Sequence, residues 1–151
     1  MRISSLIMAS TVLLFSQAAN ADEALRKKVS DAFTICSGDG VITKANAPAV
    51  ITRCNNALVT MVAFHAASQF DNLDKNWFNF NGGAVLILLA GAYTIENDNK
   101  LNKNACQNAL NANRMWSDIN AAPGSKLDID IKNDALFNKL VPLCKKIFKT
   151  D

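Results

Sequence analysis

The stretch Gly82–Ile95 constrains the fold more than any other part of the chain. It reads GGAVLILLAGAYTI and contains no charged side chain, so a helix formed here would be apolar on every side. Such a helix is either buried inside a protein or crosses a membrane. With about 14 residues, the stretch is shorter than the roughly 20 residues that a bilayer-spanning helix needs. We therefore predict a buried central helix over Gly82–Ile95.

Apolar residues recur at helical spacing on both sides of this stretch, and no segment shows the sustained alternation that is typical of a strand. Pro48 suits the first turn of a helix, because the N–H that proline lacks would have no helical partner there. Pro142 is expected to kink or split the helix that contains it. The predicted fold class is all-α, with about five helices packed around the 82–95 segment. The helices predicted beside the central one cover residues 25–36, 48–65, 101–119 and 134–148.

The first 21 residues have the features of a secretory signal peptide. Arg2 supplies a short positive region, Leu6–Phe15 an apolar stretch, and Ala19-Asn20-Ala21 the small residues that precede a cleavage site. We predict cleavage after Ala21, which leaves residues 22–151 as a single helical domain with no membrane segment. The predicted location is the periplasm, with secretion beyond it as the second choice.

The chain has four cysteines, and all of them lie in the predicted mature domain. An even number of cysteines in a small exported domain is typical of disulfide bonds, and no pair has the CxxC spacing of a redox site or a zinc ribbon. Three pairings are open. The order of the helices favours Cys36–Cys54 with Cys106–Cys144, because an antiparallel pair of helices would bring Cys106 and Cys144 level.

The inventory of reactive side chains predicts neither an enzyme nor a cofactor or metal site. The chain has one histidine, and His65 follows Leu58 and Met61 on an apolar stripe, which is typical of a histidine in or beside the core. The carboxylates Asp128, Asp130 and Asp134 lie where helix ends are expected, and such residues ordinarily cap helices. A net charge of +3 without a clustered basic patch does not predict nucleic-acid binding.

The segment Asn72–Asn81 alternates asparagines with aromatic residues and is predicted to be a loop. Its three aromatic side chains either fold onto the core or form an exposed anchor for a protein partner, since aromatic residues are common at binding hot spots. Trp77→Ala would separate these alternatives. A ring packed on the core would lower the stability when removed, whereas an exposed anchor would lower partner binding. The candidate partner-binding residues are Trp77, Phe78 and Phe80.

The order of cysteines and helices resembles that of the periplasmic immunity proteins of type VI secretion systems, in the Rap and Tai groups. The residues that carry the resemblance are CSGDG at Cys36, RCNNAL at Cys54, NACQNAL at Cys106 and LVPLC at Cys144. This chain has Asn55-Asn56-Ala57 where the family commonly has a Gly-Tyr pair after the second cysteine. The resemblance implies a stoichiometric inhibitor of a secreted cell-wall hydrolase.

Taken together, these features lead us to expect an exported, non-enzymatic binding protein of the immunity type. Two alternatives stay open, a small periplasmic stress chaperone and a carrier of a small apolar ligand between the helices. The apolar central helix could be buried within a monomer or shared across a homodimer.

Overall fold

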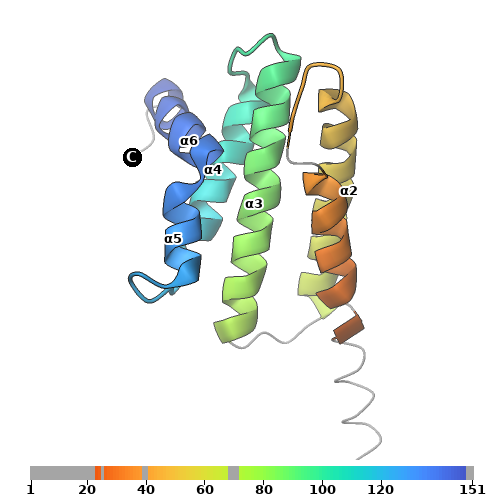
Figure 1. The fold of residues 1–151 in the computed structure, drawn as a ribbon, viewed down its shortest axis with the longest axis vertical. Helices are drawn as coiled ribbons and strands as arrows, with labels where there is room; N and C mark the ends of the chain where they lie inside the picture. The colour runs from red at the N-terminus through yellow and green to blue at the C-terminus, as the bar shows by residue number, and fades with distance from the viewer. Residues whose placement is uncertain (1–22, 25, 39–40, 68–71, 149–151) are drawn as a thin grey trace, which may run out of the picture.

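The computed structural model describes residues 23–24, 26–38, 41–67 and 72–148, and the predicted signal peptide lies outside them (Figure 1). Within these residues all regular elements are helices, which confirms the all-α fold class. The bounds are residues 23–24 and 26–37 for the N-terminal helix, Ala47–Ala67 for α2, Asn72–Glu96 for α3, Lys103–Ser117 for α4, Lys126–Asn133 for α5 and Ala135–Phe148 for α6.

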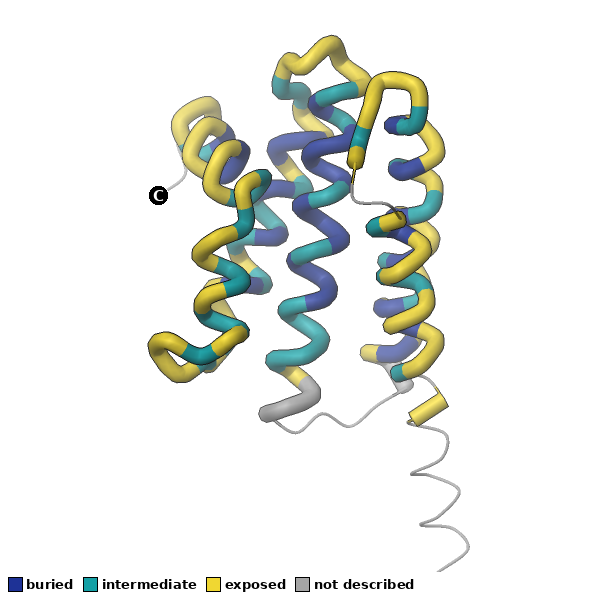
Figure 2. The backbone as a smooth tube through the Cα atoms, in the orientation of Figure 1, coloured by how far each residue is buried: buried dark blue, intermediate teal, exposed yellow. Residues whose placement is uncertain are grey.

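Helix α3 is the central element, and it separates two hydrophobic cores. Figure 1 shows α2 on one side of α3 and α4 and α6 on the other, and in Figure 2 the middle of α3 is almost entirely buried. The first core joins Val85, Leu89 and Ala92 of α3 to the N-terminal helix and α2. The second joins Leu86, Ile87 and Ala90 to α4 and α6. The predicted central helix is thus confirmed, and it is apolar all round because each side faces a core.

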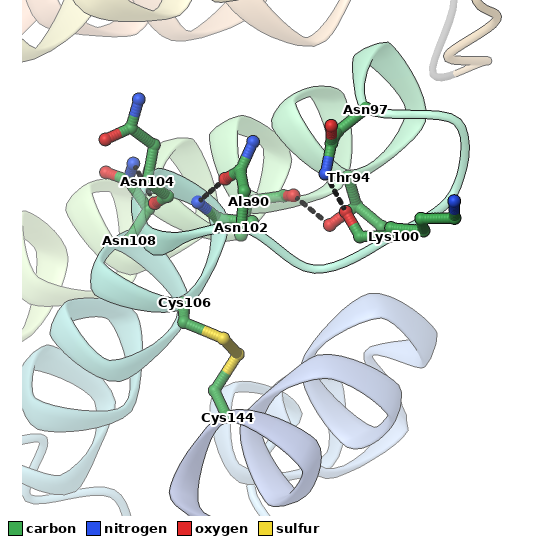
Figure 3. Close-up of a disulfide and its surroundings, with 10 residues drawn as sticks. Ala90, Thr94, Asn97, Lys100, Asn102, Asn104, Cys106, Asn108 and Cys144 are labelled. Carbon is green, nitrogen blue, oxygen red and sulfur yellow. Dashed lines mark hydrogen bonds between the residues drawn. A yellow bond between two sulfur atoms is a disulfide. The ribbon is translucent and has the colours of Figure 1, made fainter. Parts of the chain in front are cut away.

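Each core contains one disulfide. Cys36 and Cys54 are bonded in the first core, and Cys106 and Cys144 in the second, which is the pairing favoured by the sequence. Figure 3 shows the bond between Cys106 and Cys144. All four cysteines are buried. Each bond therefore ties an outer helix to its neighbour beneath the surface.

The loop predicted over Asn72–Asn81 is wrong, because these residues form the first turns of α3. The helix continues through Gly82 and Gly83, where α4 packs so closely that side chains would not fit. The segment Lys75–Glu96 is therefore long and apolar enough to cross a membrane. The expectation that the central helix is too short for a bilayer counted only Gly82–Ile95 and does not hold for the full helix. More than half of the window is buried inside the bundle, as in the core helix of a soluble protein.

The turn between α3 and α4 is held by polar side chains (Figure 3). Asn102 caps α4, and its side-chain oxygen accepts a hydrogen bond of 2.8 Å from the N–H of Ala105. The Asn97 amide donates to the carbonyl of Lys100 at 3.0 Å. Asp98 and Asn99 take left-handed backbone angles, which these two residue types tolerate better than most others. The turn therefore places Cys106 near the start of α4, facing α6.

The C-terminal helix differs from the prediction in two ways. A separate helix, α5, precedes it, and Asp134 marks the break between the two. Moreover, α6 runs without interruption through Pro142, so the predicted split does not occur. Proline removes a backbone hydrogen bond from a helix. Here the buried residues Leu140, Val141 and Cys144 on both sides of Pro142 hold the helix against the second core.

Candidate protein-binding surfaces

The three aromatic residues of the predicted partner-binding segment do not share a face. With a rotation of about 100° per residue, Phe78 lies about 100° to one side of Trp77 and Phe80 about 60° to the other, so the three side chains spread around the helix. Trp77 and Phe78 pack at the edge of the first core. Phe80 stacks on Trp116 of the second core, with ring centres 6.3 Å apart. All three side chains are partly buried.

Trp77 borders an open hollow with a volume of 600 Å³ between the N-terminal helix and α3. One edge of its ring meets the buried Phe64 at a centroid distance of 5.6 Å. The guanidinium of Arg26 lies 5.9 Å from the ring centre, a cation–π arrangement. The remaining lining residues are polar or small: Glu23, Ala24, Lys27, Ser30 and Asp31.

A smaller hollow of 290 Å³ lies on the other side of the same part of α3 and contains the only imidazole of the chain. The predicted placement of His65 in or beside the core is only partly right. The residue is exposed, and its ring contacts Phe78 at a centroid distance of 5.2 Å. Lys75, Asn79 and Asp118 complete the lining.

A pair of glycines sets the distance between α3 and α4. A Cβ atom on Gly83 would lie 2.1 Å from Nε1 of Trp116, and one on Gly82 would lie 2.4 Å from Cε of Met115. The indole N–H of Trp116 donates to the carbonyl of Phe80 at 3.0 Å, so the ring is held in that place. The absence of a side chain at Gly83 therefore allows this close contact between α3 and α4, to which Phe80 and Trp116 belong.

Asparagine 76 joins the start of α3 to the segment after α4. Its side-chain amide donates to the carbonyl of Asn120, and its side-chain oxygen accepts from the N–H of Asn120, both at 3.1 Å. Asn76, which was predicted to lie in a loop, thus satisfies the N–H and the carbonyl of Asn120, two groups that would otherwise bond to water. This clamp fixes the N-terminal half of α3, where Trp77 and Phe78 lie.

Asp128 and Asp134 act at helix ends, as predicted, whereas Asp130 lies inside α5 and forms an exposed ion pair with Lys126 at 2.6 Å. Asp134 accepts a hydrogen bond of 2.7 Å from the N–H of Phe137 at the start of α6. Hydrogen bonds from the Lys132 ammonium and the Gly124 N–H lower the pKa of Asp128 below its ordinary value. This stabilisation is present above the unfolded pKa of about 3.9 and is lost as the pH falls through the lower folded value. Across the described part of the chain, no group of three or more potential metal ligands comes together.

A second surface, between α4 and α6, was not predicted. Here Lys103, Gln107 and Leu110 of α4 and Phe148 of α6 line a groove of 360 Å³. Two features of the sequence are consistent with this groove. Neither helix contains an acidic residue, and the apolar pattern of α6 continues beyond Cys144 to its last turn.

The chain matches no protein-family model, no curated protein and no solved structure. The resemblance to periplasmic immunity proteins therefore depends on the order of the cysteines and helices alone.

Proposed function

We propose that this chain is an exported, non-enzymatic protein-binding domain, and most concretely an immunity-type inhibitor that caps a cell-wall-degrading effector in the periplasm. The observation that carries the proposal is the open hollow beside Trp77, where an aromatic ring and the Arg26 guanidinium meet. Tryptophan and arginine are enriched among the residues that dominate binding energy at protein interfaces. The two disulfides support export, because such bonds persist in oxidising compartments.

The hollow also has the anatomy of a binding site that needs little rearrangement. Its apolar part is the Trp77 ring, which Phe64 holds from the core side. Its rim is charged, and Lys27 and Asp31 form an exposed ion pair at 2.7 Å. An apolar centre with a polar rim is the usual arrangement of a protein interface. A side chain whose rotamer is already fixed loses less entropy when a partner binds.

The first experiment is affinity purification of the C-terminally tagged protein from its native periplasm, with identification of co-eluting proteins. We expect one hydrolase in a one-to-one ratio, and we expect the purified chain to inhibit that hydrolase. Recovery of the protein alone, as a homodimer, or with a small apolar molecule would contradict the proposal and favour the alternatives of self-association or ligand carriage.

A matched pair of variants then tests the hollow itself. Ser30 is exposed and lines the hollow, so Ser30→Trp would fill it without removing any core packing. Ala63 is exposed on α2 outside the hollow, and Ala63→Trp is the control. We expect Ser30→Trp to abolish capture of the hydrolase and Ala63→Trp to leave it unchanged, with both variants retaining the parent circular dichroism spectrum. Equal capture of the hydrolase by the two variants would mean that it does not bind at the hollow beside Trp77.

A further inference from the structure

We propose that the groove between α4 and α6 binds an acidic protein segment, which inserts an apolar side chain between Leu110 and Phe148. The proposal rests on the proposed function in one respect, that the chain binds proteins. It does not depend on the Trp77 hollow, because the N-terminal helix and the α4–α6 pair lie on different sides of α3 (Figure 1).

The apolar part of the groove arises where α6 extends past the second core. Val141 and Cys144 are buried, and Phe148 follows them at helical spacing on the same side of α6. Nevertheless, 46% of Phe148 is exposed, because the core has ended at that turn. Leu110 of α4 faces it across the groove and is only half-buried. A large aromatic ring and a leucine therefore form an open apolar slot.

Positive charge lies beside this slot. Lys103 lines it directly, and Lys145 lies one turn before Phe148 on α6. Neither helix contains a carboxylate, and Lys103 and Lys145 take no part in the ion pairs that Lys27, Lys44, Lys126 and Lys132 form. The groove thus combines lysine ammonium groups with an apolar centre.

This combination favours an acidic protein segment over other occupants. A second copy of the chain, docked through the same groove, would bring like charges together, which costs several kcal/mol. A membrane surface would meet the protruding Leu143 and Ile147 of α6, whereas the groove itself is concave and its volume of 360 Å³ suits an inserted side chain. The Cys106–Cys144 disulfide joins the two walls of the groove, so little ordering is needed on binding.

The test is photo-crosslinking in the native cells with the full chain. A benzophenone amino acid replaces Gln107 in the groove or, as the control, Val62, which is 66% exposed on α2. We expect a covalent protein adduct from position 107 and not from position 62, with the linked peptide rich in aspartate and glutamate. Adding Lys103→Glu and Lys145→Glu should lower the adduct yield by about tenfold, since like charges would then meet. Lys28→Glu/Lys75→Glu, an equal charge change at two exposed positions outside the groove, should not lower it.

Four results would overturn the groove proposal. These are an adduct only from position 62, an adduct with a second copy of the chain, no adduct from either position, and flotation of the purified protein with phosphatidylglycerol vesicles that Lys103→Glu/Lys145→Glu abolishes. In each case the affinity purification still decides the proposed function by itself, because capture of a stoichiometric hydrolase does not require the groove. The failure of one proposal is therefore distinguishable from the failure of the other.

Discussion

At the scale of single residues, the side-chain amides of asparagine stabilise helix ends by hydrogen bonding to the backbone. The Asn46 oxygen accepts from the N–H of Thr43 at 2.7 Å, while its amide nitrogen donates to the carbonyl of Val41 at 3.0 Å. Asn76 makes the same two-way contact with one distant residue. Because an amide both donates and accepts, it can satisfy backbone groups that a helix end leaves without partners.

The contact between α3 and α4 leads to a prediction at Gly83. We expect Gly83→Ala to lower the free energy of unfolding by about 2 kcal/mol, because the new methyl would overlap a tryptophan ring that a hydrogen bond holds in place. The gain of about 1 kcal/mol in helix propensity from replacing glycine by alanine is too small to offset this clash. Urea unfolding followed by circular dichroism measures the change.

Gly91 provides the control in the same helix. A Cβ atom there would lie 3.2 Å from Cδ1 of Leu136, the end of a flexible side chain that can move aside. We expect Gly91→Ala to leave stability unchanged or slightly raised, because helix propensity then decides the outcome. If Gly83→Ala and Gly91→Ala lose stability equally, the close approach of α4 at Gly83 is not the reason that α3 needs glycine there.

At the scale of elements, each disulfide determines how firmly one outer helix is attached. Cys106–Cys144 closes 38 residues and Cys36–Cys54 closes 18. In the chain-entropy description these loops correspond to about 4 and about 3 kcal/mol of stability. We expect Cys106→Ala/Cys144→Ala to lower the free energy of unfolding more than Cys36→Ala/Cys54→Ala, because it releases the longer loop. Urea unfolding followed by circular dichroism measures both losses. A larger loss from Cys36→Ala/Cys54→Ala would contradict the chain-entropy account.

The sequence predicts the outer helices from the helical spacing of their apolar residues. It predicts the central helix and the pairing of the cysteines because apolar content and helix order are local information. It fails at Asn72–Asn81, because the helix there is stabilised by distant partners, such as Asn120 for Asn76 and Trp116 for Phe80. The sequence predicted a kink or a split at Pro142, and the split does not occur, because burial on both sides of Pro142 outweighs the lost hydrogen bond.

The candidate surfaces were predictable only in part. The aromatic composition around Trp77 predicted a candidate binding segment, yet the loop assignment for that segment was wrong. The groove between α4 and α6 depends on two helices that lie far apart in the sequence and on the end of a core, neither of which periodicity reveals. The sequence shows in advance only the absence of acidic residues from both helices and the apolar pattern at the end of α6.

At the scale of the whole molecule, two cores share one helix, so they should unfold together. Val85 and Leu89 belong to the first core and Leu86 and Ala90 to the second, which means that neither core can lose α3 without exposing the other. Small domains with this kind of mutual dependence unfold in one cooperative transition.

The two tryptophans allow this cooperativity to be measured directly. Trp77 packs against the first core and Trp116 lies in the second, and the chain has no other tryptophan. Trp116→Phe leaves fluorescence that reports the first core, and Trp77→Phe leaves fluorescence that reports the second. Within each variant, we expect the urea midpoint from fluorescence to equal that from circular dichroism, because the loss of α3 removes both cores at once. A fluorescence midpoint that departs from the circular dichroism midpoint in either variant would mean that the two halves unfold separately, and that α3 stays folded on one core after the other has dissolved.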